Sequence, residues 1–311
     1  MSTLDVSVVI VTWNSAVFVG QCLDALQWNT HCAFECLLVD NASSDNTVAM
    51  VRRDFPWVTV LEPGRNLGFA AANNLALRRA IGRHLLLLNP DTEVEEGALD
   101  ALIDLLDRRP TAGAVGARLL NTDATLQYST YRLPSAATLA WEYFLRDVRR
   151  PNDPRAGRYA EADYARERPV EGLLGACLLV RRQAAEHVGW LDERFAMYCE
   201  EVDWCIRLRR AGWDLWYSPD APVVHHSGQS SRLAPARSFL HLQRSRFRLY
   251  SKWYSPTKRV LLESITRAGM LYQTTFWLKQ FLRGRVTRIE CRERLLLSLK
   301  VVALRPSGQE R

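Results

Sequence analysis

The sequence VSVVIV, at residues 6–11, is a nearly continuous run of β-branched apolar residues, and Thr12, Trp13 and Asn14 follow it. A strand with one wet face alternates apolar and polar residues, whereas a continuous run is typical of a strand buried on both faces. Such strands occur in parallel sheets that helices cover on both sides. Apolar residues then recur at helical spacing over residues 19–26, so we expect a helix after this strand.

The same alternation continues along the first third of the chain. Apolar runs predict further strands at residues 34–39, 58–61 and 84–88. Helices are predicted at residues 46–54, 69–81 and 95–108. These strand–helix units predict an α/β fold with a mostly parallel sheet and helices on both faces. Because ligands of such sheets bind beyond the carboxyl ends of the strands, the residues that follow each strand are candidate site residues.

The pattern becomes looser after residue 110. Residues 146–169 contain few apolar positions and are predicted to form a long mobile surface loop. Regular structure is expected again at residues 170–180, 201–211, 214–217 and 223–226. From about residue 232 the chain is expected to be helical, so we predict a domain at residues 1–231 and a basic amphipathic helical extension at residues 232–311.

The composition is that of a soluble globular protein. Of the 311 residues, 48% are apolar and 24% are charged, which excludes a disordered chain and a coiled coil. The late uncharged run at 268–278 is far shorter than the ~20 residues of a membrane span. No basic region precedes the first apolar run, so no signal peptide is expected. The seven cysteines form no C-x-x-C pair and are expected to be reduced thiols of a cytoplasmic protein.

The charge is distributed unevenly along the chain. The net charge of +7 divides into −7 for residues 1–227 and +14 for residues 228–311. In the basic segment Tyr250 and Trp253 alternate with Arg248 and Lys252. Aromatic residues among basic ones suit an anionic membrane surface, and nucleic-acid binding is a competing interpretation. An ordinary helical subdomain with a solvated basic face is the third.

Two acidic residues, Asp91 and Glu93, follow the strand predicted at 84–88. At positions i and i+2 of a loop they can reach one cation together. Oxygen ligands suit Mg²⁺ or Mn²⁺, which usually bind together with substrate phosphates. A surface turn that leads into an acidic helix start is the alternative.

Three further groups of polar residues each allow a functional and a structural interpretation. Asp40 can bind a base edge or a ribose hydroxyl, or form a turn with its neighbour. Glu200, Glu201 and Asp203 are expected to start a helix. Like charges close together raise the pKa of one of the carboxyl groups, which would suit a general base. The alternative is that these acids only complement the positive end of the helix dipole. The pair at 225–226 can supply a histidine beside two carboxylates to a divalent ion, or consist of ordinary core or surface residues.

In this order the motifs resemble those of the family 2 glycosyltransferases with the GT-A fold. The matching stretches are SVVIVTWNSA (7–16), LLVDNASSDNT (37–47), NLGFAAANN (66–74), LLLLNPDTEV (85–94), GACLLVRR (175–182), FAMYCEEVDWCIRLRRAGW (195–213) and VVHHSGQSS (223–231). The resemblance covers roughly residues 5–231 and is strongest to the bacterial rhamnosyltransferase-like branch, which builds cell-wall and surface polysaccharide on lipid-diphosphate carriers. It implies a nucleotide-sugar half at about 1–118 and an acceptor half at about 119–231.

The resemblance also implies roles for single residues. The residues implied in nucleotide-sugar binding are Thr12, Asn14, Asp40, Asn66, Gly68, Asp91, Gly175 and Ala176. Of these, Thr12 and Asp40 would line the base and ribose, and Gly175 would lie under the donor sugar or the acceptor. Asp91 and Glu93 would also hold the metal, Mg²⁺ or Mn²⁺, with His226 or His225 as the third ligand.

The implied catalytic residues are Glu200, Glu201 and Asp203. Glu200-Glu201 corresponds to a family pair whose second member is usually Asp and acts as the base. Here that position is Glu201, which is one methylene longer, and this departure leaves Asp203 as a rival base. We found no Ser or Cys constellation that would indicate a covalent intermediate.

The resemblance implies an inverting hexosyltransferase of cell-wall polysaccharide biosynthesis that uses a metal-assisted single displacement. The donor would be dTDP- or UDP-linked, with L-rhamnose from dTDP-rhamnose suggested by the branch. The acceptor would be a glycan or a lipid-diphosphate-linked sugar. The protein would be cytoplasmic and peripheral on the inner face of the cell membrane, bound by its C-terminal extension, and nucleic acid is not expected as a partner.

Other classes of protein fit the sequence less well. An NAD-dependent enzyme would have Gly-x-Gly-x-x-Gly after the first strand, where Thr12 to Ala16 stand instead. A nucleotidyltransferase would have an early glycine-rich basic loop, which is missing. A non-catalytic α/β module that binds membrane surfaces or nucleic acid explains the basic extension but not the acidic residues at the strand ends.

Overall fold

The computed structural model describes residues 4–145, 153–227 and 235–304. They divide into two compact units. The first contains residues 4–132, 159–196 and 200–227, and the second contains residues 133–145, 153–158, 197–199 and 235–304. The boundary that we predict between residues 231 and 232 falls in a stretch outside the described residues.

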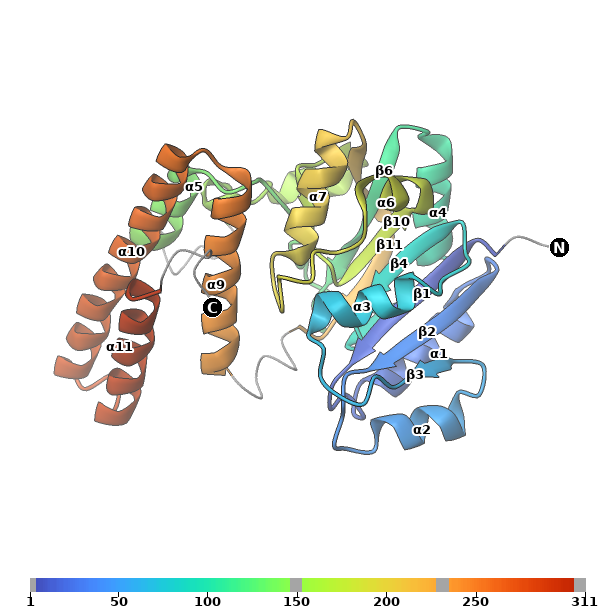
Figure 1. Ribbon diagram of the computed structural model, residues 1–311, viewed down its shortest axis with the longest axis horizontal. Helices are drawn as coiled ribbons and strands as arrows, with labels where there is room; N and C mark the ends of the chain where they lie inside the picture. Colours follow the sequence, from blue (N-terminus) through green and yellow to red (C-terminus); the bar gives the residue numbers. More distant parts are fainter. Residues whose placement is uncertain (1–3, 146–152, 228–234, 305–311) are drawn as a thin grey trace. The chain divides into compact units, whose positions relative to one another are not determined.

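A central sheet forms the first unit (Figure 1). Its first four strands are β3 (Thr59–Leu61), β2 (Phe34–Asp40), β1 (Val6–Thr12) and β4 (His84–Leu88), and all three neighbouring pairs are parallel. The sheet continues through β10 (Cys177–Arg181), β6 (Ala112–Leu120), β11 (Asp214–His225) and β5 (Thr92–Val94). In this half β10 and β5 are antiparallel to their neighbours, whereas β6 and β11 are parallel.

Short strands lie beside this path. β8 (Arg168–Pro169) pairs with β11, and β7 (Thr130–Tyr131) pairs with β9 (Gly172–Leu173) in a sheet of their own. The fold class predicted from the sequence, a mostly parallel α/β sheet with helices on both faces, is therefore confirmed.

The side chains of β1 explain its continuous apolar run. Val8 and Ile10 lie in a core cluster with α1 (Val19–Asn29), α2 (Thr47–Asp54) and α4 (Ala98–Arg108). Val9 and Val11 point to the other face, into a cluster with α3 (Phe69–Leu77), α6 (Arg182–Val188) and α7 (Glu200–Arg210). A strand between two helical layers has no wet face, so every position of β1 is buried.

Residues 153–169, the described part of the segment predicted as a mobile loop at 146–169, contain regular elements, so for these residues the prediction is wrong. Two 3₁₀ helices, η2 (Pro154–Ala156) and η3 (Glu161–Ala165), precede β8. Tyr159 and Tyr164 are buried in the second core cluster, and the rings of Tyr164 and Tyr217 are 4.9 Å apart. Residues 146–152 lie outside the described part.

The second unit is helical. It contains α5 (Ala136–Ala140), the π-helix η1 (Trp141–Leu145), α9 (Pro235–Trp253), α10 (Pro256–Leu282) and α11 (Arg288–Val302). Leu139 and Tyr143 pack with Phe247 and Leu262 in its own core, which explains why the segment after residue 132 belongs to this unit. Among the described helices, none combines the length and apolar character required to cross a bilayer.

Candidate active site

Thr12 and Asp40 end the adjacent strands β1 and β2 and lie opposite each other in register. Thr12 Oγ1 donates a hydrogen bond to Asp40 Oδ1 at 3.2 Å, and the backbone N of Ser43 donates to Asp40 Oδ2 at 2.9 Å. Both Thr12 and Asp40 are buried. Two donors therefore hold the Asp40 carboxylate in one orientation at the carboxyl edge of the sheet.

Asn14 and Asn41 hold the loops around this carboxylate. Asn14 has the left-handed backbone conformation, with φ of 53°, and its Oδ1 accepts from the backbone N of Ser44 at 2.8 Å. The buried Asn41 Oδ1 accepts from the backbone N of Leu67 at 2.6 Å. Asn41 thereby ties the loop before α3 to the end of β2.

Gly68 occupies a position that requires glycine. Its φ is +82°, and a Cβ added there would lie 2.9 Å from the carbonyl oxygen of Ala196. That oxygen also accepts a hydrogen bond from the backbone N of Phe69 at 2.9 Å. Asn66 Oδ1 accepts from the backbone N of Gly68 at 2.9 Å, so both predicted residues of this loop shape the start of α3.

Asp91, Glu93 and the two histidines meet because β5 pairs with the end of β11. Glu93 lies opposite Val224 in this antiparallel pair. His225 Nε2 is 3.4 Å from Asp91 Oδ1, and His226 Nε2 is 2.6 Å from Glu93 Oε1. Residues more than 130 positions apart in sequence thus form two acid–histidine pairs, as predicted for the metal site.

These pairs do not form a complete metal cage. Within the described ranges, no group of three or more His, Cys, Asp and Glu side chains is arranged to hold an ion. Carboxylate and imidazole donors nevertheless match the chemistry of Mg²⁺ and Mn²⁺. Mg²⁺ commonly takes only one or two protein carboxylates and completes its shell with phosphate oxygens and water, so the donor set fits an ion that binds together with a diphosphate.

Gln127 is a polar neighbour of this site that the sequence did not indicate. Its Oε1 lies 2.6 Å from His225 Nδ1, and its Nε2 donates to the His225 carbonyl oxygen at 3.2 Å. Gln127 precedes β7 in the region where the apolar pattern is loose. No periodicity or motif marks such a residue, because its role depends on a partner 98 positions away.

Glu200 and Glu201 begin α7 with unusual protonation properties. Burial raises the pKa of Glu201 from 4.5 to about 7. Burial, and after it the charge of Glu201, raises the pKa of Glu200 well above its ordinary value. Among the described residues, Oε2 of each carboxyl group has no hydrogen-bond partner. A carboxyl group with a pKa near 7 can exchange a proton at neutral pH.

The loop before β10 connects Glu201 with the end of β4. A Cβ added to Gly175 would lie 3.5 Å from Glu201 Cβ, in ordinary contact. The next residue, Ala176, is buried and accepts a hydrogen bond from the backbone N of Asn89 at 2.9 Å. Asn89 Nδ2 is in turn 3.4 Å from His225 Nε2. The predicted residues Gly175 and Ala176 thus lie between the acid pair of α7 and the acid–histidine pairs.

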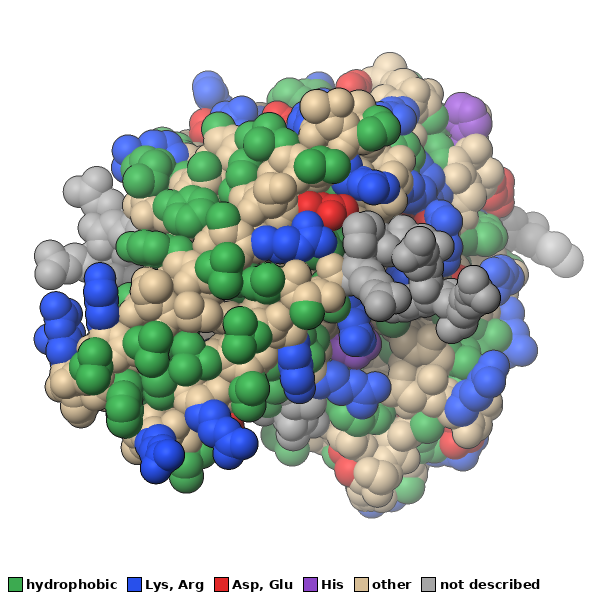
Figure 2. Space-filling model, turned by 60° about the vertical axis from the view of Figure 1, so that its left-hand side comes forward, with side chains coloured by type: hydrophobic (Ala, Val, Ile, Leu, Met, Phe, Trp, Pro, Cys, Tyr) green, Lys and Arg blue, Asp and Glu red, His purple; other side chains and the backbone are tan. Residues whose placement is uncertain are grey.

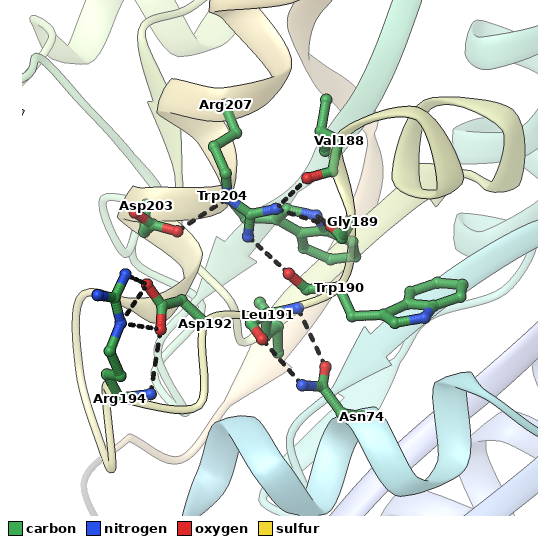
Figure 3. Close-up of polar contacts among 10 residues, drawn as sticks. All are labelled: Asn74, Val188, Gly189, Trp190, Leu191, Asp192, Arg194, Asp203, Trp204 and Arg207. Carbon is green, nitrogen blue, oxygen red and sulfur yellow. Dashed lines mark hydrogen bonds and ion pairs between the residues drawn. The ribbon is translucent and has the colours of Figure 1, made fainter.

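Asp203 has a different environment from Glu201. It lies in the group of polar contacts that Figure 3 shows. It is fully buried, and its Oδ2 accepts a hydrogen bond from Arg207 Nε at 2.9 Å. The Arg207 guanidinium also donates to the carbonyl oxygens of Val188, Gly189 and Trp190, each at 2.7 Å. Asp203 therefore orients an arginine that fastens α7 to the turn after α6.

Asn74 extends this network to α3 (Figure 3). Its Oδ1 accepts from the backbone N of Leu191 at 3.0 Å, and its Nδ2 donates to the Leu191 carbonyl oxygen at 2.8 Å. Asn74 Nδ2 also donates to Glu193 Oε1 at 2.9 Å. Although Asn74 ends the quoted NLGFAAANN stretch, no role was predicted for it, since its partner is 117 residues away.

Comparison with known proteins identifies a family and several relatives that are similar to this chain. Residues 7–189 match the family Glycosyl transferase family 2. The chain is 31% identical over 288 residues to the N-acetylglucosaminyl-diphospho-decaprenol L-rhamnosyltransferase of Mycobacterium tuberculosis, with 89% of this chain and 94% of the relative covered. It is 26% identical to the rhamnosyltransferase WbbL of Escherichia coli, over 62% of this chain and 72% of the relative.

A solved structure is similar in fold. The mannosyltransferase PcManGT from Pyrobaculum calidifontis, in complex with GDP-Man and Mn²⁺, superimposes with a TM-score of 0.57 at 17% identity. The match covers 97% of this chain and 86% of the mannosyltransferase.

Proposed function

The chain belongs to glycosyl transferase family 2, and on this premise we propose that it transfers L-rhamnose from dTDP-rhamnose to a sugar linked to a lipid diphosphate. The mycobacterial relative, whose name states that donor sugar and an acceptor of that class, supports this choice. The observation that carries the proposal is the link from Glu201 through Gly175 and Ala176 to the acid–histidine pairs. The proposed base and the residues proposed to bind the diphosphate would thereby lie at the same edge of the sheet.

The nucleotide would bind at the ends of β1 and β2. The oriented carboxylate of Asp40 retains lone pairs that can accept hydrogen bonds from a ribose hydroxyl or a base edge. Asn14 and the loop that contains Asn66 and Gly68 would border the bound nucleotide. The hydrogen bonds within these loops support this placement.

Asp91, Glu93 and one histidine of the 225–226 pair would hold a Mg²⁺ or Mn²⁺ ion beside the donor diphosphate. When bound, such an ion neutralises the negative charge that develops on the leaving diphosphate. The mannosyltransferase of similar fold was solved with Mn²⁺ and a nucleotide sugar together, which is consistent with this assignment.

Glu201 would act as the general base. As the acceptor hydroxyl oxygen forms its bond to the anomeric carbon, the bond from that carbon to the diphosphate oxygen breaks, and the hydroxyl proton passes to Glu201. dTDP leaves, and this single displacement inverts the anomeric configuration. The pKa of about 7 suits the task, because a base is most effective when its pKa is near the working pH.

The second unit would bind the membrane that carries a lipid-linked acceptor. We call the exposed hydrophobic side chains of its two last helices the α10–α11 apolar surface: Val260, Leu261, Leu271, Tyr272, Phe276, Leu278, Phe281, Leu282, Ile289, Leu296 and Leu299. Figure 2 shows hydrophobic side chains with Lys and Arg among and around them on the face that carries these helices. With +14 over residues 228–311, this surface suits an anionic leaflet.

The test is a transfer assay with the full chain. dTDP-rhamnose, UDP-GlcNAc and GDP-mannose are each offered with a polyprenyl-diphosphate-linked GlcNAc acceptor, in MgCl₂, in MnCl₂ and in excess EDTA. We expect transfer from dTDP-rhamnose, with the anomeric configuration of the product inverted in NMR spectra, and none in EDTA. Transfer from another donor only would contradict the assigned sugar, and full activity in EDTA would contradict the metal site.

The non-catalytic alternative, a module that binds membranes or nucleic acid, is not favoured. The family and both curated relatives are transferases. Such a module would bind vesicles without consuming any of the three donors, so the same assay separates the two.

A further inference from the structure

Gln127 holds the ring and the backbone of His225 at the same time. Its Oε1 faces His225 Nδ1 at 2.6 Å, and its Nε2 donates to the His225 carbonyl oxygen at 3.2 Å. The same Nε2 donates to Asn121 Oδ1 at 3.0 Å, and the backbone N of Gln127 donates to the Leu119 carbonyl oxygen at 2.8 Å. These contacts fix one orientation of the Gln127 amide.

The orientation of this amide determines which nitrogen of His225 carries the proton. An amide NH₂ group only donates, so a Gln127 whose Nε2 bonds two oxygens presents its carbonyl oxygen to His225 Nδ1. Nδ1 is then the donor, and Nε2 of the neutral ring is an unprotonated acceptor. Asn89 agrees with this tautomer, because its donor Nδ2 lies 3.4 Å from His225 Nε2.

His225 Nε2 therefore presents a lone pair beside a carboxylate oxygen. Asp91 Oδ1 is 3.4 Å away. Neighbouring ligands of an octahedral ion with bonds of about 2.1 Å are about 3 Å apart, so this pair is close to ligand spacing. His226 differs, since its Nε2 is 2.6 Å from Glu93 Oε1, a distance at which the ring nitrogen donates a hydrogen bond to the carboxylate.

We propose that Gln127 is a positioning residue for the divalent ion, which holds His225 in the Nδ1–H tautomer and so makes His225, rather than His226, the histidine ligand. Neighbours that accept from the second nitrogen of a metal-binding histidine orient the ring and raise its basicity. The inference rests on the proposed metal-dependent function and adds the residue that selects between two adjacent histidines.

The tautomer is measured without metal or turnover. The metal-free full chain, labelled with ¹⁵N-histidine, is examined by long-range ¹H–¹⁵N NMR, with the His225 signals assigned from the spectrum of His225→Gln. We expect a protonated Nδ1 and an unprotonated Nε2, and in Gln127→Ala a mixture of both tautomers. A protonated Nε2 in the unaltered chain, or an unchanged pattern in Gln127→Ala, would overturn the proposal.

Metal affinity is measured separately, by the loss of the free Mn²⁺ signal in electron paramagnetic resonance on titration with MnCl₂ in the presence of dTDP. Gln127→Ala should weaken Mn²⁺ binding by about 10- to 100-fold. Gln127→Glu keeps an acceptor for Nδ1–H and should restore binding, which a merely structural role would not predict. His225→Gln should weaken binding more than His226→Gln.

The matched control is Gln27→Ala, which removes an exposed glutamine that accepts from Trp57 Nε1 at 2.9 Å in α1. It should bind Mn²⁺ like the unaltered chain. Equal Mn²⁺ affinity of Gln127→Ala and the unaltered chain, or a larger loss in His226→Gln than in His225→Gln, would overturn the proposal. A chain that shows the expected pattern yet transfers no sugar would contradict the proposed function and leave this inference standing.

Discussion

Glu200 and Glu201 are neighbours in the chain, and the carboxyl groups of both have a raised affinity for a proton. Burial raises the pKa of Glu201 to about 7, and burial together with the charge of Glu201 raises the pKa of Glu200 well above its ordinary value. With a pKa of about 7, about half of the Glu201 carboxyl groups are ionised at pH 7. Glu201 can therefore take up a proton near neutral pH.

Replacing Glu201 by glutamine should remove this base while keeping its shape. We expect Glu201→Gln to lower kcat by about 10²-fold or more, with dTDP-rhamnose binding little changed, because the side chain acts on the acceptor proton. Steady-state kinetics and calorimetric titration of the donor measure the two effects. Asp203→Asn should instead keep most of its turnover at temperatures where it is folded. If Asp203→Asn is inactive and Glu201→Gln is active, the base is Asp203.

The pH dependence of kcat should follow the ionisation of Glu201. The active form is the carboxylate, so activity should be lost as the pH falls through about 7 and should level off above it. A profile between pH 5.5 and 9 measures this, with a solvent isotope effect to establish that the proton transfer limits the rate. A flat profile in the presence of that isotope effect would contradict the assignment.

The sequence indicated residues that belong to local motifs and missed those that act across the fold. Asp91 and the histidines follow strands in recognisable stretches, and the structure brings them together. The sequence of residues 200–203 does not show which acid is a base and which has a structural role. That difference depends on the three carbonyl groups that Arg207 contacts. Gln127 has no local signal. The functional roles of all these residues stay predictions.

At the scale of elements, one arginine makes several of the polar contacts that attach α7 to the turn after α6. Arg207 satisfies the carbonyl oxygens of Val188, Gly189 and Trp190, and the buried Asp203 balances its charge. Trp204 Nε1 donates to the same Gly189 oxygen at 2.9 Å. Since α7 begins with Glu200 and Glu201, this attachment also positions the proposed base.

Arg207→Met should destabilise the protein, because it removes the guanidinium that forms an ion pair with the buried Asp203 and donates to three backbone carbonyl groups. Breaking a buried ion pair costs about 3 kcal/mol or more, and urea unfolding followed by circular dichroism measures the loss. Arg209→Met is the matched control, since Arg209 is exposed on the same helix and should change the free energy of unfolding by less than about 0.5 kcal/mol. Equal effects of the two variants would show that Arg207 does not fasten α7.

The elements that the sequence predicted best are the strands that are buried on both faces. Continuous apolar runs located β1, β2 and β4 within a residue or so of their observed ends. The ordered segment of η2 and η3 was missed, because a few tyrosines among charged residues give no periodicity. Tyr159 and Tyr164 of this region are nevertheless buried in the second core cluster.

At the scale of the whole molecule, the full chain should bind anionic vesicles reversibly. Each basic residue near such a surface contributes about 1 kcal/mol, so a few engaged residues of the +14 segment suffice. Binding should weaken with added salt, because the Debye length at 0.1 M is only about 10 Å. Co-sedimentation with phosphatidylglycerol-containing and with purely phosphatidylcholine vesicles, at low and high salt, measures this.

Point variants test whether the α10–α11 apolar surface is the part that binds. Phe276→Ser with Phe281→Ser should reduce vesicle binding, whereas Trp28→Ser, at an exposed aromatic of α1, should not. Both changes affect exposed side chains, so the fold should be retained. Equal binding to both vesicle types would contradict an electrostatic component. If the double variant instead dissociates an oligomer and leaves vesicle binding unchanged, the surface contacts a second copy of the chain.

The buried carboxyl groups of α7 also make folding a reaction that takes up protons. Glu201 has a pKa of about 7 in the folded chain against an ordinary value of 4.5, and Glu200 is shifted in the same direction. The folded state thus holds protons that the unfolded state releases, and the free energy of unfolding falls as the pH rises from about 4.5 to about 7. When the chain unfolds at pH 6, it releases these protons and the buffer binds them. The calorimetric heat of unfolding should therefore differ between phosphate and imidazole by the number of protons released multiplied by the difference in the ionisation enthalpies of the two buffers.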